Sequence, residues 1–263
     1  MIVCRSKAEV QKLRQVNQLV GRILNELRQM VVPGVTTEEI DASAEALVRE
    51  AGAEPAFKGY HGFPATVCSS VNEQIVHGIP SARRLVEGDV LSLDMGAKLD
   101  GFYGDSAVTV PVGGVSADAA RLLRVTETAL FHGIEAVKPG ARVSDIGAAV
   151  QAHVEEHGFS VVREFVGHGI GSSLHEEPQI ANYGPANRGP RLAEGMAMAI
   201  EPMVNAGAAA VKVLSDGWTA VTRDGSLSAH FEHTVVVADG GYEILTLLDA
   251  DAARTRELRA VSG

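Results

Sequence analysis

The sequence predicts an α+β protein made of two related halves, and three observations lead to this fold class. Each half opens with two patterns of apolar residues at helical spacing, and strand-like apolar runs follow each pair. The same landmarks then return in the same order. Because 46% of the 263 residues are apolar, the chain is long enough to bury one substantial core. We expect a single domain over 1–263, with pseudo-repeats at about 6–112 and 116–248.

The first half begins with two helices whose N-termini carry capping boxes. Apolar residues recur at helical spacing over 6–30, and Ser6 with Glu9 has the spacing of a capping box. A second capping box, Thr36–Glu39, opens a helix that we expect to stop at Gly52. The apolar runs after this helix are typical of strands.

The second half repeats these landmarks at a nearly constant offset. A helix expected over 116–137 ends before Pro139–Gly140, which lies 106 residues after Pro33–Gly34. The segment "LVEGDVLSLD" then aligns with "LAEGMAMAIE", which places Asp94 opposite Glu201. Any one of these alignments can arise by chance, but their shared order and spacing favour an internal duplication. Two halves that pack about a pseudo-two-fold axis bring Asp94 and Glu201 face to face.

Charge and cysteine content exclude several classes of function. The formal net charge is −10 with Lys and Arg scattered along the chain, so we expect no nucleic-acid surface. The N-terminal segment is too polar for a signal peptide or a membrane span. Cys4 and Cys68 lack a metal-binding spacing and a secretory context, and are expected to be free thiols. These features predict a cytoplasmic protein with no membrane partner.

A hairpin in the first half carries two acidic residues inside apolar strands. The stretch "VLSLDMGAKLDGFYGDSAVTV" (90–110) predicts two strands around a turn at Lys98–Gly101, with Asp94 in one arm and Asp105 in the other. The two residues are expected to pair across the hairpin and to share a face if the register allows it. Burying two like charges side by side costs several kcal/mol unless something compensates them.

Three further polar residues lie in apolar or glycine-flanked runs: Glu201, Glu232 and His168. Four neighbouring carboxylates are balanced by two divalent cations, a known arrangement in hydrolytic enzymes. A single divalent ion balances only half of the charge of the four carboxylates. Calcium or magnesium in a structural site is the main alternative, because both prefer oxygen ligands. The histidine favours manganese, iron, cobalt or zinc. Taken one at a time, such residues are more often surface or structural groups.

The motifs around these residues resemble a known family. In order along the chain, the five candidates match the metal ligands of the pita-bread metallopeptidases. The surrounding segments are similar to those of type I, bacterial-type methionine aminopeptidases, as in "GYHGFPATVCSS", "GHGIGSSLHEEPQI" and "AIEPM". The resemblance implies the pita-bread fold, with two α/β halves whose joined, largely antiparallel sheet is covered by helices. It also implies removal of the initiator methionine by metal-activated water attack on the first peptide bond, with small second residues favoured.

The resemblance also implies a role for each site residue. The ligands of two divalent ions, Co, Mn, Fe or Zn, are expected to be Asp94, Asp105, His168, Glu201 and Glu232. Glu201 also shuttles a proton, His175 stabilises charge on the substrate carbonyl, and His77 faces the scissile nitrogen. The substrate-binding positions are Tyr60, His61, Phe63, Cys68, His77, Leu174, His175 and Trp218. Leu174 departs from the family, in which this position is often phenylalanine. Asn72 and Ser228 match positions that hold an accessory monovalent cation.

Two alternatives remain open at this point: an X-Pro peptidase of the same fold, and a non-catalytic binding module that kept the fold without its metals. The expected partners are the N-termini of nascent polypeptides. The acidic chain offers no basic surface for ribosomal RNA, so any ribosome association is expected to be transient. The chain is expected to be a monomer.

Overall fold

A computed structural model describes residues 1–248 and shows an α+β fold. The last part of the expected domain, 249–263, lies outside the described residues. The helices are α1 (Lys7–Met30), α2 (Thr37–Glu50), the short 3-10 turn η1 (Tyr60–Gly62), α3 (Ala117–Glu135) and α4 (Val143–Glu156).

The strands form one large sheet and two small ones. The large sheet has the order β1-β4-β5-β14-β9-β7-β8, with β2 also paired to β4 and β15 to β14, and its neighbouring strands are antiparallel. Its strands are β1 (Glu54–Pro55), β2 (Val67–Val71), β4 (Val90–Leu99), β5 (Phe102–Pro111), β7 (Gly167–Gly169), β8 (Glu176–Ile180), β9 (Ala197–Ile200), β14 (Glu232–Ala238) and β15 (Gly241–Ile244). The small sheets contain β3 (Gln74–Val76), β6 (Ser160–Val161), β10 (Met203–Asn205), β11 (Val211–Val213), β12 (Ala220–Thr222) and β13 (Ser228–His230).

The helix boundaries follow the predicted capping residues. Ser6 caps α1 and Thr36 caps α2, each with a complete capping box that satisfies backbone N–H groups of the first turn. Helix α2 ends at Glu50, and Gly52 adopts φ +73° just beyond it, a conformation that glycine takes without strain. Both predicted capping boxes are therefore confirmed.

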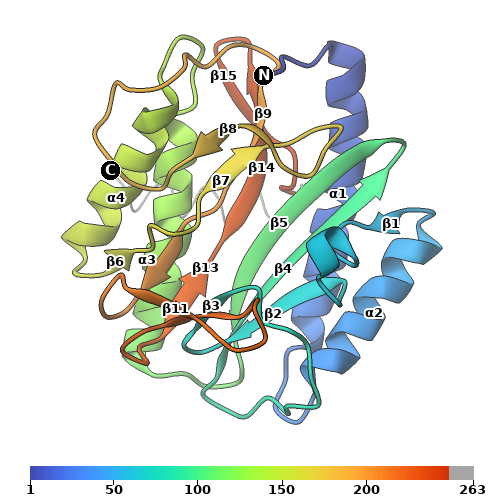
Figure 1. The fold of residues 1–263 in the computed structure, drawn as a ribbon, viewed down its shortest axis with the longest axis vertical. Helices are drawn as coiled ribbons and strands as arrows, with labels where there is room; N and C mark the ends of the chain where they lie inside the picture. Colours follow the sequence, from blue (N-terminus) through green and yellow to red (C-terminus); the bar gives the residue numbers. More distant parts are fainter. Residues whose placement is uncertain (249–263) are drawn as a thin grey trace.

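The helices pack against the two halves of the sheet. Helix α1 contacts β4 and β5 and crosses behind them in Figure 1, while α3 and α4 lie together beside the other half. The core accordingly forms two main clusters, one beneath α1 and α2 and one beneath α3 and α4. Burial of this apolar area is the main driving force for the fold.

The hairpin of β4 and β5 has a different register from the one expected. Asp100 (φ +49°) and Gly101 (φ +81°) form a two-residue turn with both residues in the left-handed region, as in a type I′ hairpin. This turn pairs Asp94 with Ala107, so Asp105 lies diagonally from Asp94 instead of opposite it. The expectation of a direct pair is wrong by two residues. The shared face is right, because alternate residues of a strand point the same way.

Two smaller expectations concern the thiols and the membrane. Cys4 is a free, exposed thiol and Cys68 a free, buried one, as predicted. Within residues 1–248, every helix is too short or too polar to span a bilayer.

Candidate metal centre

Five consecutive strands of the large sheet bring the five predicted ligands together. In the order β4-β5-β14-β9-β7, the strands supply Asp94, Asp105, Glu232, Glu201 and His168, with Glu201 directly after the end of β9. The register places these residues on one face of the sheet, because their cross-strand partners and the alternate residues of each strand align. Residues from both halves of the chain therefore meet on one surface.

The distances at this surface suit metal coordination. Single ligand atoms of Asp105, His168 and Glu232 lie within 4.8 Å of one another, and all three residues are buried. The Nε2 atom of His168 is 3.5 Å from Oε1 of Glu201 and 3.8 Å from Oδ2 of Asp105. Carboxylate oxygens and an imidazole nitrogen converge on one small volume.

The protonation of His168 leaves a lone pair free at this point. Its Nδ1 lies 2.9 Å from the carbonyl oxygen of Gly169, which accepts hydrogen bonds and donates none, so Nδ1 carries the proton. Burial, followed by the proximity of His175, lowers the pKa of His168 to about 4, and the ring is neutral at physiological pH. A neutral imidazole whose other nitrogen donates to a carbonyl is the usual form of a metal-ligating histidine.

The carboxylates are buried without partners that compensate them. Oδ1 of Asp94, Oδ1 of Asp105 and Oε1 of Glu232 are buried side-chain oxygens with no hydrogen-bond partner. Burial raises the pKa of Asp94 to about 7, and burial together with neighbouring carboxylates raises the pKa values of Asp105, Glu201 and Glu232 well above their ordinary range. Orphaned carboxylate oxygens grouped around a free imidazole nitrogen are the donor set of a divalent metal, so these residues fit such an ion.

The metal centre lies in a cavity of about 290 Å³ that also contains the other predicted site residues. His77 and His175 line it together with Tyr60 and the exposed His61. The ring of His175 is centred 4.3 Å from that of His168, and its Nδ1 is 2.7 Å from the hydroxyl of Tyr60.

The apolar side of this cavity is made of the predicted pocket residues. Phe63, Cys68 and Leu174 are buried, and Trp218 packs edge-on against Phe63 with 5.2 Å between the ring centroids. The cavity is therefore lined both by the candidate carboxylate ligands and by aromatic, aliphatic and sulfur-containing side chains.

Residues 11–239 match the model of metallopeptidase family M24. That range covers most of the chain and contains all five candidate ligands.

The chain belongs to metallopeptidase family M24.

Similar sequences and solved structures agree with the resemblance that the sequence motifs indicated. Methionine aminopeptidase 1 of Bacillus subtilis is 52% identical over 94% of this chain and 99% of its own. The crystal structure of methionine aminopeptidase from Rickettsia prowazekii matches with a TM-score of 0.93 and 42% identity, over 94% of this chain and all of that one. The prolidase from Pyrococcus furiosus, at 22% identity and a TM-score of 0.76 over 94% of this chain and 66% of that one, shows the fold alone. The predicted pita-bread fold and the resemblance to methionine aminopeptidases are confirmed. M24 membership also establishes use of a divalent metal.

The M24 site contains a histidine that the sequence reasoning missed. His230 is buried, and its Nε2, which has no hydrogen-bond partner, lies 3.7 Å from Oε2 of Glu201. Burial lowers the pKa of His230 to about 3, so this ring is also neutral. Its position two residues before Glu232 was the available signal, because such residues share a face in an extended chain.

Other lining residues of the M24 cavity were also missed. They are Phe57, Val76, Phe165, Val166 and Met203. Apolar residues of this kind are indistinguishable in sequence from ordinary core residues.

The two residues expected near an accessory cation lie side by side. The backbone N–H of Ser228 donates to the carbonyl oxygen of Asn72 at 2.9 Å. The hydroxyl of Ser228 donates to Oδ1 of Asn205 at 2.9 Å, and the amide of Asn72 donates to Asp89 at 2.8 Å.

Proposed function

We propose that this chain is a metal-dependent methionyl aminopeptidase that removes the initiator methionine from newly made proteins. The observation that carries the proposal is the convergence of the five candidate ligands, from five consecutive strands, in one cavity that also has apolar lining residues. Three of them, Asp105, His168 and Glu232, offer ligand atoms within 4.8 Å of one another. Relatives named methionine aminopeptidase over nearly the whole chain support the same activity.

The proposed metal ligands are Asp94, Asp105, His168, Glu201 and Glu232. Two divalent ions supply +4 against the four carboxylates, which removes the electrostatic penalty of grouping them. The imidazole favours manganese, iron, cobalt or zinc over calcium or magnesium. When bound, such ions polarise the scissile carbonyl and lower the pKa of a water molecule.

The remaining polar residues position the peptide and move protons. The Tyr60 hydroxyl lies 2.7 Å from Nδ1 of His175, and when the hydroxyl donates to Nδ1 the imidazole proton lies on Nε2. His175 can then donate to the substrate carbonyl oxygen and stabilise the charge that develops there. Glu201 accepts and returns the proton, and His77, which also lines the cavity, faces the scissile nitrogen of the bound peptide.

Specificity for methionine is assigned to the apolar wall. Phe63, Cys68, Leu174 and Trp218 suit a flexible thioether, which packs well against aromatic rings and sulfur. Leu174 in place of the usual phenylalanine gives a slightly different pocket for the same side chain. Beyond the scissile bond, small second residues such as Gly, Ala and Ser are favoured.

The wider setting of the activity follows from the same proposal. The substrates are N-termini of nascent polypeptides in the cytoplasm, and contact with the ribosome is transient. The chain acts as a monomer and as one catalytic domain over 1–263, with pseudo-repeats at about 6–112 and 116–248. An accessory monovalent cation near Asn72 and Ser228 is included in the proposal.

The test is hydrolysis of a Met-Ala-Ser peptide by metal-loaded protein, compared with a proline dipeptide. We expect metal-dependent release of methionine, and its loss in Asp105→Ala and Glu232→Ala. Glu38→Ala, which removes an exposed carboxylate on α2, serves as the matched control and should keep full activity. Full activity of both ligand variants would refute the metal centre, and faster cleavage of the proline dipeptide would favour an X-Pro peptidase. Absence of bound metal and of turnover with every divalent ion would favour a binding module.

A further inference from the structure

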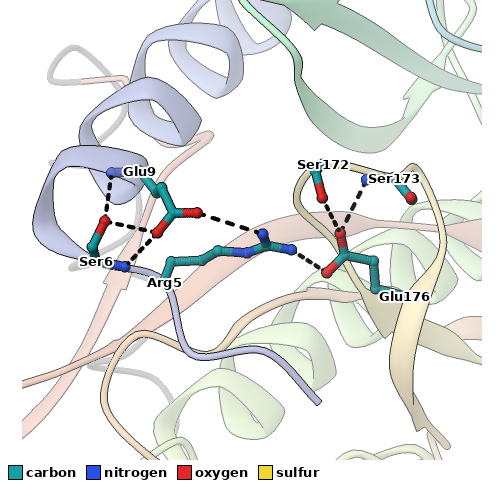
Figure 2. Close-up of polar contacts among 6 residues, drawn as sticks. All are labelled: Arg5, Ser6, Glu9, Ser172, Ser173 and Glu176. Atoms are coloured by element: carbon teal, nitrogen blue, oxygen red, sulfur yellow. Dashed lines mark hydrogen bonds and ion pairs between the residues drawn. The ribbon is translucent and has the colours of Figure 1, made fainter. Parts of the chain in front are cut away.

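The segment before α1 is anchored to the active-site loop through Arg5. The side chain of Arg5 is 5% exposed, and its guanidinium forms an ion pair and hydrogen bond with Oε2 of Glu176, the first residue of β8 (Figure 2). The backbone N–H of Arg5 donates to the carbonyl oxygen of Gly195 at 2.8 Å. Gly171 lies so close that a Cβ added there would overlap the guanidinium. Arg5 is therefore packed into the fold over its whole length.

Glu176 uses its second oxygen to hold the loop between β7 and β8. Oε1 of Glu176 accepts from the backbone N–H of Ser173 at 3.0 Å and from the hydroxyl of Ser172 at 3.2 Å (Figure 2). Gly171 in the same loop accepts from the backbone N–H of Tyr103 at 2.8 Å. One carboxylate thus joins Arg5 on one side to the loop on the other.

This loop carries two site residues that differ in how they are held. Leu174 is 2% exposed and belongs to the core cluster beneath α1 and α2. His175 is exposed, and its side chain is held by the hydroxyl of Tyr60 and by ring contacts with Tyr60 and His168. A change in the loop backbone therefore moves His175 more readily than Leu174.

We propose that Arg5 is a positioning residue for His175, acting through Glu176 and the loop 171–175. Arg5 touches neither the cavity nor the metal ligands, and acts by fixing the carboxylate that orders the loop. The inference rests on the proposed function, because His175 is the group that stabilises the developing charge on the substrate carbonyl. An arginine suits this place because its planar fork approaches Glu9, at 3.8 Å, while it binds Glu176.

The kinetic test uses Arg5→Ala in metal-loaded protein with the Met-Ala-Ser peptide. We expect kcat to fall about ten-fold, because small displacements of a catalytic group have large effects on rate, while KM changes less since Leu174 stays in the core. In a His175→Ala background the same change should alter kcat less than about two-fold, because the group it positions is gone. Arg5→Lys should recover part of the loss. The matched control is Arg14→Ala, which removes the ion pair between Arg14 in α1 and Glu243 in β15, 2.6 Å apart, and should leave kcat unchanged.

A second measurement does not depend on turnover. Arg5→Ala should speed hydrogen exchange of the Ser173 backbone N–H, whose acceptor is Glu176, and Arg14→Ala should not. Unchanged exchange, an unchanged kcat, or an equal loss of kcat with and without His175 would each overturn the proposal. If the parent protein cleaves no methionyl peptide but the exchange still changes as expected, the proposed function fails while the anchoring of the loop by Arg5 stands.

Discussion

The charge on Asp94 is predicted to limit the stability of the metal-free protein at alkaline pH. Burial, with Oδ1 left without a hydrogen-bond partner, raises the pKa of Asp94 to about 7, compared with an ordinary value of 3.8. The folded state binds the Asp94 proton more tightly than the unfolded chain does, so protonation of Asp94 stabilises the fold. This contribution to the free energy of unfolding is complete below the ordinary pKa of 3.8. It is lost as the pH rises through about 7.

The size of the effect follows from the difference between the raised pKa of Asp94 and its ordinary value. One pKa unit corresponds to about 1.4 kcal/mol, so a pKa raised from 3.8 to about 7 changes the free energy of unfolding by at most about 4 kcal/mol. Asp94→Asn removes the charge and keeps the shape. The metal-free variant should therefore have a free energy of unfolding up to about 4 kcal/mol above that of the parent at pH 8, and about equal to it near pH 4. With metal added, Asp94→Asn should remain inactive, because it lacks one of the proposed metal ligands.

The assay is urea unfolding of chelator-treated protein at both pH values. Asp89→Asn is the matched control, because Asp89 is also buried but accepts from Asn72 and the backbone of Val86, and its replacement should destabilise the fold. Added metal should stabilise the parent more than Asp94→Asn, since a bound ligand stabilises the folded state. A variant that is less stable than the parent at pH 8, or a difference independent of pH, would refute the reasoning.

Three further predictions follow from individual contacts. A Cβ at Gly147 in α4 would overlap the carbonyl oxygen of Ala181, so Gly147→Ala should lower the free energy of unfolding in urea by about 2 kcal/mol or more. Gly241 has open space around it, so the control Gly241→Ala should change that free energy by less than about 0.5 kcal/mol. Tyr60→Phe should lower kcat about ten-fold with little change in KM, because it removes the hydroxyl bound to Nδ1 of His175 and keeps the ring; an effect confined to KM would contradict this. Burial, then neighbouring histidines, lower the pKa of His153 to about 4, so the folded protein loses stability as the pH falls from 6.5 towards 4. His153→Gln should reduce that loss by about 1 kcal/mol after allowance for solvent screening. Thermal melting curves that respond equally to pH in the parent and the variant would argue against this.

The sequence predicted the parts of the fold that local chemistry determines. The capping boxes at Ser6 and Thr36 and the period of the apolar residues identify α1 and α2 without tertiary information. The four candidate carboxylates were visible because charged groups in apolar runs require compensation, and His168 was visible because glycines flank it. The pairing register of β4 with β5 was harder to predict from the sequence. The dipeptide Asp100–Gly101 was a readable signal for a two-residue turn, and that turn decides which residue faces Asp94.

Long-range contacts between polar side chains gave no such signal. Arg5 and Glu176 are separated by 171 positions, and neither lies in a motif that points to the other. His230 differs, because it lies two residues before a ligand on an extended segment and periodicity alone places it near the site. Sequence reasoning finds groups whose local environment is unusual, and misses ordinary pairs that only the packing of the two halves brings together.

The sheet explains how so many carboxylates fit around one centre. Three cross-strand neighbours of the candidate ligands are small: Ala107 lies between Asp94 and Glu232, Gly96 faces Asp105, and Ala199 pairs with His168. A larger side chain at these positions would fill the space above the sheet that ions and a peptide need; a Cβ on Gly96 already comes within 2.9 Å of Phe57, which lines the cavity. The strands hold the carboxylates in place by backbone hydrogen bonds, so the anionic groups cannot separate to relieve their repulsion. Metal affinity and the low intrinsic stability of the metal-free site therefore have the same structural origin.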